Sequence, residues 1–207
     1  MEIKDTYKTI DVASEEVLFK DRNSKFFGYA FPVSNEADIK KHLEALKKSH
    51  HTARHWCYAW QLGKSEPFRF RANDDGEPSN SAGMPIYGQI QSFDVTNILI
   101  VVVRYFGGTK LGVGGLINAY RTGAQMALEV ADIKEKTINI DYLLIFDYKN
   151  MNKVMRVIKE RNLNITAQQL EMDCRITISV RQKDAQQIFD LFTNMYEIQI
   201  KSLEEIV

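Results

Sequence analysis

The chain of 207 residues has few cysteines and prolines, and its charges balance to zero. Its two cysteines, Cys57 and Cys174, are too few for the disulfide framework of a small secreted protein. Balanced charge excludes a global field that would attract nucleic acid or an anionic membrane. The longest aliphatic run, ILIVVV, is too short to span a bilayer, and the opening MEIKDTYKTIDV lacks the basic and apolar regions of a signal peptide. We therefore expect a cytoplasmic protein that does not engage a membrane.

What the sequence does have is a hydrophobic content of 44%, which is enough for a substantial core. Residues 12–33 predict two strands around the turn DRNSK, and SNEADIKKHLEALKKSHH predicts a helix capped by Ser34 or Asn35. The segment HWCYAWQL alternates like a strand, whereas NILIVVVRYF is typical of a strand covered on both faces. Four-residue spacing predicts a further helix from Gly114 to about Asp132.

The strand and helix pattern restarts after a boundary near Ile133–Thr137. The segments that follow have the order β-α-β-β-α-β, which is the plan of a split βαβ or ferredoxin-like domain. The sequence therefore predicts an α+β protein with a first domain at 1–132 and a ferredoxin-like domain at 137–207.

The stretch RYFGGTKLGVGGLINAY concentrates glycines between an apolar strand and a helix. They are Gly107, Gly108, Gly112, Gly114 and Gly115. Because glycine costs backbone entropy, this density indicates positive φ angles or a close approach of the backbone. A strand, a glycine-rich turn and a helix can form a phosphate cradle, with Lys110 and Arg104 available to an anion. The spacing fits neither the P-loop nor the dinucleotide-binding pattern, so a turn that only packs the helix onto the sheet is an equal alternative.

The stretch DDGEPS offers three carboxylates within a predicted turn, at Asp74, Asp75 and Glu77. Hard oxygen ligands of this kind could hold Mg²⁺ beside a phosphate. The favoured interpretation is a solvated acidic turn in which one carboxylate pairs with Arg69, Arg71 or Arg104. The helix after the turn is expected to be capped by Ser79 or Ser81.

His55 and Cys57 share one face of the strand HWCYAWQL, so a Cys–His nucleophile pair is conceivable. Their separation along the strand disfavours that pair, and the spacing of His51, His55 and Cys57 fits no common zinc motif. A small buried thiol and a histidine hydrogen-bonded nearby are the favoured alternative.

The segment KKHLEALKKSHHTARH is the one locally basic stretch, and its cations could contact RNA phosphates. The rings of Trp56, Tyr58 and Trp60 in the next strand could stack bases. Each feature has a common structural alternative, because charged helix faces are usually solvated and a row of rings usually packs in a core.

Three motifs, HWCYA, DDGEPSNSAGMP and VVVRYFGGTKLGVGGLINAY, resemble those of the bacterial YigZ and eukaryotic IMPACT family in order and spacing. The resemblance implies a first domain folded like domain IV of elongation factor G and a second similar to its domain V. Asn80 and Ser81 depart from the usual Gly-Thr, and Asn118 stands where arginine is frequent, which removes a contact if that arginine meets a phosphate. The positions that match are His55, Cys57, Ala59, Asp74–Pro78, Ala82, Gly83, Pro85, Arg104–Gly108, Lys110–Gly112, Gly114–Leu116, Ala119 and Tyr120.

The resemblance implies translation-related regulation and no known reaction. No serine, histidine and acid stand in a recognisable catalytic arrangement, so a binding protein is favoured over an enzyme and no residue is assigned as catalytic. The leading hypothesis is contact with RNA, the ribosome or a translation factor, without a cofactor. Mg-dependent phosphate or nucleotide binding on the same surface and a purely protein–protein regulator are the alternatives, and the oligomeric state is left open.

Within the expected surface, Arg104 should pair with an acid of the turn and Lys110 should stay free for a phosphate. Cys57 is expected to be buried and unreactive beneath the helix that follows the glycines. The expected binding residues are Asp74, Asp75, Gly76, Glu77, Ser79, Arg104, Gly107, Gly108, Lys110, Gly112, Gly114 and Gly115, with His55 and Cys57 as auxiliary residues and no metal ligand.

Overall fold

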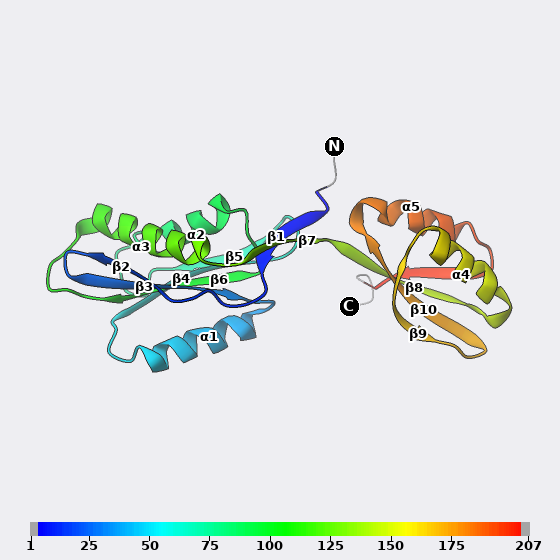
Figure 1. The fold of residues 1–207 in the computed structure, drawn as a ribbon, viewed down its shortest axis with the longest axis horizontal. Helices are drawn as coiled ribbons and strands as arrows, with labels where there is room; N and C mark the ends of the chain where they lie inside the picture. The colour runs from blue at the N-terminus through cyan, green and yellow to red at the C-terminus, as the bar shows by residue number, and fades with distance from the viewer. Residues whose placement is uncertain (1–3, 204–207) are drawn as a thin grey trace. The chain divides into compact units, whose positions relative to one another are not determined.

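A computed structural model describes residues 4–203, which form two compact units. One unit is Tyr7–Lys136, and the other combines the residues before Tyr7 with those after Lys136. The fold is α+β, with a five-stranded sheet in the first unit and a four-stranded sheet in the second (Figure 1). Within residues 4–203, every helix falls short of the length and apolar character that a membrane crossing requires.

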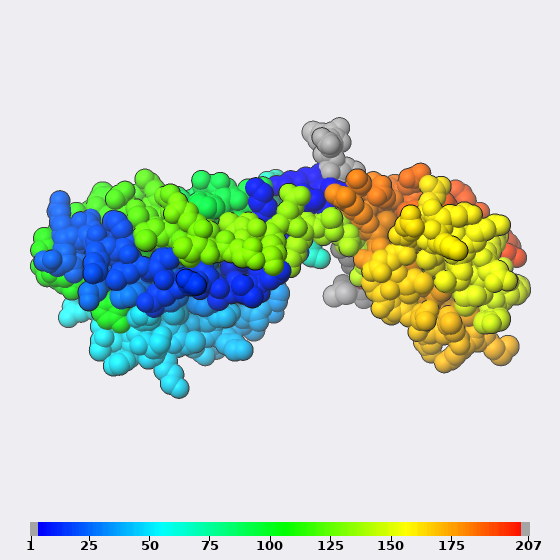
Figure 2. Space-filling view, in the orientation of Figure 1, coloured from blue at the N-terminus to red at the C-terminus, as the bar shows by residue number. Residues whose placement is uncertain are grey.

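The first unit packs helices on both faces of its sheet. Its strands pair antiparallel in the order β2-β3-β6-β4-β5. Helices α2 and α3 cover one face and α1 covers the other (Figure 1), and the space-filling view separates the cyan α1 side from the green α3 side across the blue strands (Figure 2). The elements are β2 (Val17–Asp21), β3 (Ser24–Pro32), α1 (Glu36–Ser49), β4 (His55–Leu62), β5 (Arg69–Asn73), α2 (Gly83–Ser92), β6 (Ile98–Tyr105) and α3 (Gly112–Glu129).

The sequence pattern explains these layers. The run Ile98–Val103 of β6 is buried on both faces, as its lack of alternation predicts. In β4 the small residues Cys57 and Ala59 face the core beneath α2 and α3, whereas Trp60 faces the core beneath α1. The Asn35 side chain caps α1 by accepting the Asp38 N–H at 3.0 Å, which confirms one of the two expected caps.

Helix α3 runs over Gly112–Glu129, so it begins two residues before the expected Gly114 and ends before Asp132. The expected boundary at Ile133–Thr137 is itself a strand, β7, which pairs with β1 (Thr6–Ile10). Lys134 and Lys136 of β7 form ion pairs with Asp11. Because three of the five residues of IKEKT are charged, the segment lacks the hydrophobic pattern that would predict a strand. The limits of the two domains as folding units stay a prediction.

The second unit has the expected βαββαβ-like order, with the sheet order β11-β8-β10-β9. Buried and more exposed residues alternate along β10, where Cys174, Ile176 and Ile178 point into one core. This period of two indicates a sheet with helices on one face. The expected last strand extends into residues 204–207, which lie outside the described residues. The elements are β8 (Asn139–Asp147), η1 (Tyr148–Asn150), α4 (Met151–Glu160), β9 (Asn164–Gln169), β10 (Asp173–Arg181), α5 (Gln182–Thr193) and β11 (Ile198–Ser202).

Candidate functional site

The acidic turn between β5 and α2 is held together by the Asp74 carboxylate. Its Oδ1 accepts the backbone N–H groups of Ala82 and Gly83 at 2.9 and 2.8 Å, and its Oδ2 accepts the N–H of Asn80 at 2.9 Å. A carboxylate at this position satisfies free donors of the first helical turn and interacts favourably with the helix dipole. Asp74 is therefore the cap of α2.

The prediction that Ser79 or Ser81 caps α2 is wrong. No side chain at the residue directly before the helix caps it, and the Ser81 hydroxyl donates instead to the Pro78 carbonyl at 2.6 Å. Local capping rules consider only residues next to the helix, whereas Asp74 reaches its first turn from the other end of a folded loop.

Asp75 ties the same turn to β4. Its Oδ2 accepts the Trp56 N–H at 2.7 Å, and its carbonyl lies 2.9 Å from His55 Nδ1. Because a carbonyl can only accept, Nδ1 of His55 carries the proton and its Nε2 faces the other way. The Cys57 thiol donates to the Asp74 carbonyl at 2.9 Å. His55 and Cys57 therefore hold two successive carbonyls of the turn and do not form a pair with each other.

The Cys57 thiol is fully buried, as expected. Burial raises its pKa well above the usual range, so the thiol stays protonated. This environment matches the favoured interpretation of a buried, hydrogen-bonded thiol, and its lack of reactivity stays a prediction.

Glu77 of the acidic turn lies close to side chains from three other elements, β4, β6 and α3. Its Oε1 accepts from Arg104 Nη1 at 2.6 Å and from the Tyr120 hydroxyl at 2.8 Å, and His55 Nε2 lies 4.0 Å away. The side chains of Glu77 and Arg104 are only 5% and 6% exposed, so this is a buried ion pair. The expected pairing of Arg104 with an acid of the turn is confirmed, with Glu77 as the partner.

The sequence did not single out Tyr120 as a functional residue. Burial raises the pKa of its phenol far above the usual range, which keeps it a neutral donor to Glu77. Its four-residue spacing in α3 predicts only a core position, and nothing local in the sequence links it to an acid 43 positions earlier.

Arg104 also connects the acidic turn to the glycine loop, which is residues 106–111. Its guanidinium carbon lies 5.4 Å from the centre of the Phe26 ring and 5.5 Å from that of Phe106. Arg104 Nε is buried without a hydrogen-bond partner among the described residues. Cation–π contacts with both rings and a charge-assisted bond to Glu77 hold this guanidinium at the start of the loop.

Two positions at the glycine loop require glycine, one because of a close backbone contact and one because of a positive φ angle. A Cβ at Gly107 would lie 2.1 Å from the Asn23 carbonyl carbon, so the loop packs against the β2–β3 turn too closely for any side chain. Gly112 has a φ of +72°, which glycine adopts most readily, and α3 starts there. Helix α3 has no side-chain cap and no acid in its first turn, while Lys110 and Gly114 are exposed.

The predicted site residues thus fall into two groups. His55, Cys57, Asp74, Asp75 and Glu77 form one bonded cluster with Arg104, and a Cβ at Gly76 would lie 3.6 Å from the His55 ring. The remaining predicted residues, Gly107, Gly108, Lys110, Gly112, Gly114 and Gly115, belong to the loop and the start of α3, and Ser79 is exposed in the turn.

The three acids do not form a magnesium site. Each carboxylate serves a different partner: the start of α2, the backbone of β4, and Arg104. Among residues 4–203, no three His, Cys, Asp or Glu side chains gather in a way that could hold a metal ion. The donor set therefore does not fit Mg²⁺.

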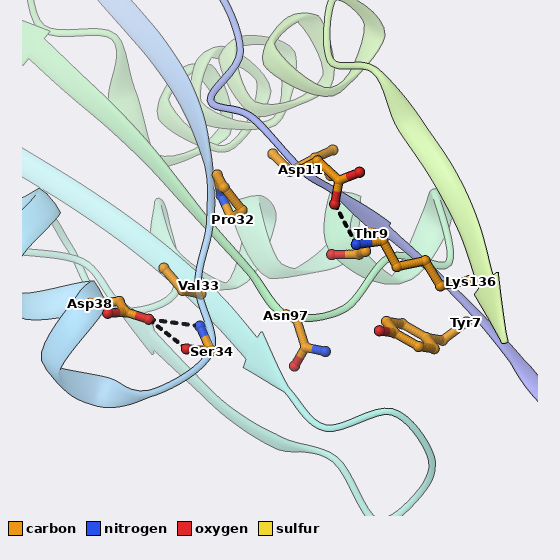
Figure 3. Close-up of a pocket in the computed structure, with 10 residues that line it drawn as sticks. Tyr7, Thr9, Asp11, Pro32, Val33, Ser34, Asp38, Asn97 and Lys136 are labelled. Atoms are coloured by element: carbon orange, nitrogen blue, oxygen red, sulfur yellow. Dashed lines mark hydrogen bonds and ion pairs between the residues drawn. The ribbon is translucent and has the colours of Figure 1, made fainter. Parts of the chain in front are cut away.

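A cavity of about 290 Å³ lies elsewhere in the first unit, next to β1 and β7 (Figure 3). Its polar groups are largely paired with one another, since Asp11 accepts from Lys136, and Asp38 accepts from the N–H and hydroxyl of Ser34 at 3.0 and 2.7 Å. No predicted site residue lines it. The charged groups of this cavity therefore serve the local structure by pairing with one another.

A family model described as the Impact N-terminal domain matches residues 22–128. The chain belongs to the IMPACT family. The IMPACT family member YigZ of Escherichia coli (strain K12) is 33% identical over 146 residues, which cover 70% of this chain and 72% of YigZ. A crystal structure of a hypothetical protein matches 98% of this chain and 100% of its own, with 25% identity and a TM-score of 0.70. The two-domain translational regulator Yih1 matches 58% of this chain and 46% of its own at 25% identity, with a TM-score of 0.37 that is too low for a structural comparison.

Asn80 and Ser81, the two positions at which the resemblance implies Gly-Thr, both fit the acidic turn of this IMPACT family member. Asn80 has a φ of 60°, a left-handed conformation that asparagine tolerates better than most residues. Ser81 is fully buried, and its hydroxyl bond to Pro78 needs only the oxygen that threonine would also supply. Asn118 is exposed on α3.

Proposed function

We propose that this IMPACT family member is a translation-associated regulatory binding protein. Its binding surface would be the acidic turn joined to the glycine loop, with RNA phosphate or a ribosomal partner as ligand. The proposal includes kinship of the first domain with domain IV of elongation factor G, separate folding domains at 1–132 and 137–207, and a cytoplasmic location. Family membership and the resemblance of the motifs support it.

The observation that carries the proposal is the exposed, uncapped start of α3 next to Lys110. The first N–H groups of a helix attract anions when no side chain satisfies them, and no acid stands in this first turn. Of the three acids of the turn, Glu77 is neutralised by Arg104, while Asp74 and Asp75 direct carboxylate oxygens to backbone N–H groups of α2 and β4. Phe106 and Val113, both exposed, add apolar surface beside Lys110 in the chain.

An enzymatic alternative has less support. The buried thiol of Cys57 and the paired carboxylate of Glu77 are both engaged in holding the turn. With no metal donor set among the described residues, a Mg-dependent phosphate site would have to bring its ion with the ligand.

Ribosome co-sedimentation from lysate across a salt series tests the proposal. The Lys110→Ala variant should bind more weakly and lower the salt slope by about one unit, because one phosphate contact is lost. Stability should change by less than about 0.5 kcal/mol, since Lys110 is exposed.

Lys64→Ala is the matched control, because Lys64 is also exposed but lies in the turn between β4 and β5. Co-sedimentation that no salt weakens would favour a protein–protein regulator. Wild-type binding by Lys110→Ala would mean that the glycines only form a packing turn.

A further inference from the structure

Strand β5 is an edge of the five-stranded sheet. Among residues 4–203 it pairs with β4 alone, so its outer side presents backbone N–H and C=O groups to which a further strand could bind. The start of α2 covers the backbone of the last residue of β5, because a Cβ at Gly83 would lie 2.5 Å from Asn73 N. The open part is therefore residues 69–72, termed here the β5 edge.

Side chains of different chemistry alternate along the β5 edge. The β4–β5 register places Arg69 and Arg71 on the face of α1. Phe70 lies on the face of α2, where its ring stacks on that of Tyr87 with the two centroids 4.2 Å apart. Phe70 is nevertheless 51% exposed. A half-exposed ring and two arginines thus stand on opposite faces of one short edge.

A groove lies on each face of the sheet beside the β5 edge, since α1 and α2 are on opposite faces (Figure 1). The groove on the face of α1 has a volume of about 580 Å³ and includes Arg71. The groove on the face of α2 has a volume of about 380 Å³ and is lined by Phe70 together with Tyr87 and Ile90 of α2. A strand added to the β5 edge would direct successive side chains into one groove and then the other.

The groove on the face of α1 holds a cation that a ligand can pair with. Its two acids each have a cation nearby, since Glu36 bonds to Arg69 and Glu44 lies 3.9 Å from Lys40. Arg71 is exposed and forms no ion pair within residues 4–203. One carboxylate placed beside Arg71 would therefore find an unpaired guanidinium.

The groove on the face of α2 has the opposite character. Among the described residues that line it, the charged ones are both acids, Glu66 and Asp94, and they stand beside the apolar rings of Phe68 and Phe70. A nucleic-acid strand carries a phosphate at every nucleotide and would be repelled by these acids. An apolar side chain can instead cover the exposed part of the Phe70 ring.

We propose that the β5 edge binds an extended segment of a partner protein as an added strand, with an acidic side chain opposite Arg71 and an apolar one opposite Phe70. Backbone hydrogen bonds supply the affinity, and the two neighbouring side chains supply the specificity. A second copy of this chain fits poorly, because symmetric antiparallel pairing of two β5 edges would set arginine opposite arginine. No residue of the acidic turn or the glycine loop lines either groove, so this inference does not rest on the function proposed above.

The test uses the full chain labelled with ¹⁵N and a blocked peptide of alternating glutamate and valine, about eight residues long, as strands commonly are. The amide resonances of residues 69–72 should shift on binding, and hydrogen exchange should slow at the amides that face the peptide. Arg71→Glu should weaken binding about fivefold or more, because an ion pair becomes a repulsion. The same variant should bind a peptide of alternating lysine and valine more tightly than the wild type does, which also shows that it is folded.

Lys20→Glu makes the same change of net charge on the opposite edge strand, β2, and should bind like the wild type. The glutamate–valine peptide with methylated backbone nitrogens cannot donate to the β5 edge and should not bind. Wild-type binding of both peptides by Arg71→Glu, or equal binding of the methylated peptide, would overturn the proposal. So would protection of the β5 amides that rises with protein concentration alone, which would indicate a second copy, or shifts of these amides with an oligouridylate and not with the peptide.

Discussion

At the scale of single residues, one carboxylate organises the candidate site. Glu77 Oε1 accepts from Arg104 on β6 and from Tyr120 on α3, and it lies near His55 on β4. Removing two charges from water is costly, so a buried pair like this one depends on its additional hydrogen bonds and on the cation–π contacts of Arg104 with Phe26 and Phe106. Removing one partner of the pair should therefore lower the free energy of unfolding more than removing both partners.

We predict that Arg104→Ala lowers the free energy of unfolding by about 3–5 kcal/mol, because it leaves the Glu77 carboxylate buried without its counter-charge. Urea denaturation of Arg104→Ala, Glu77→Ala and the double variant measures the coupling. The double variant should be less destabilised than the sum of the single variants. Additive losses would show that the pair does not act as a unit.

The sequence predicted that Arg104 pairs with an acid of the turn, but it did not predict which acid. An arginine after an apolar strand and three nearby acids suffice to expect a pair, yet Asp74, Asp75 and Glu77 are equivalent in sequence and only the folded turn selects Glu77. Tyr120 lies on the four-residue repeat of α3, and such spacing reports burial and not the partner of a hydroxyl.

At the scale of elements, the acidic turn is a structural device for starting α2. Asp74 accepts three backbone N–H groups, two of them at the first turn of the helix. It thereby fixes the loop that presents Glu77 to Arg104. The hydrogen bonds of Asp74 therefore serve the structure of the turn itself.

Asp74→Ala should lower the free energy of unfolding by about 2 kcal/mol, the upper range for loss of a helix cap. Ser79→Ala, which removes one of the two caps that the sequence predicts, should change it by less than about 0.5 kcal/mol because Ser79 is exposed. Chemical denaturation of both variants separates the two interpretations. A larger loss for Ser79→Ala would restore the serine as the cap.

Elements with a strong period were predictable, and those with mixed polarity were not. The apolar run of β6 predicted a strand covered on both faces, and β10 lies within a segment that was predicted to form two strands. The ribbon of β1 and β7 was missed because IKEKT carries its stabilising contacts as ion pairs to Asp11, which leave no hydrophobic pattern. Long-range pairing of charged strands has no local signature.

At the scale of the whole molecule, each unit has a hydrophobic core of its own. The first unit holds two cores, one on each face of its sheet, and the second holds one beneath α4 and α5. Both tryptophans belong to the first unit, so their fluorescence reports on that unit alone. This distribution allows the independence of the two cores to be measured in the intact chain.

We predict that Phe192→Ala destabilises the second unit without moving the unfolding midpoint of the first. Phe192 is fully buried in the second core, and truncating such a ring typically costs about 3–5 kcal/mol. Far-ultraviolet circular dichroism in urea should show an earlier partial transition, while the midpoint of tryptophan fluorescence stays that of the wild type. Ile86→Ala, at an equally buried position of the first unit, is the control and should shift the fluorescence midpoint. If Phe192→Ala shifts both signals together, the two units unfold as one cooperative structure and the division into 1–132 and 137–207 does not describe how the chain folds.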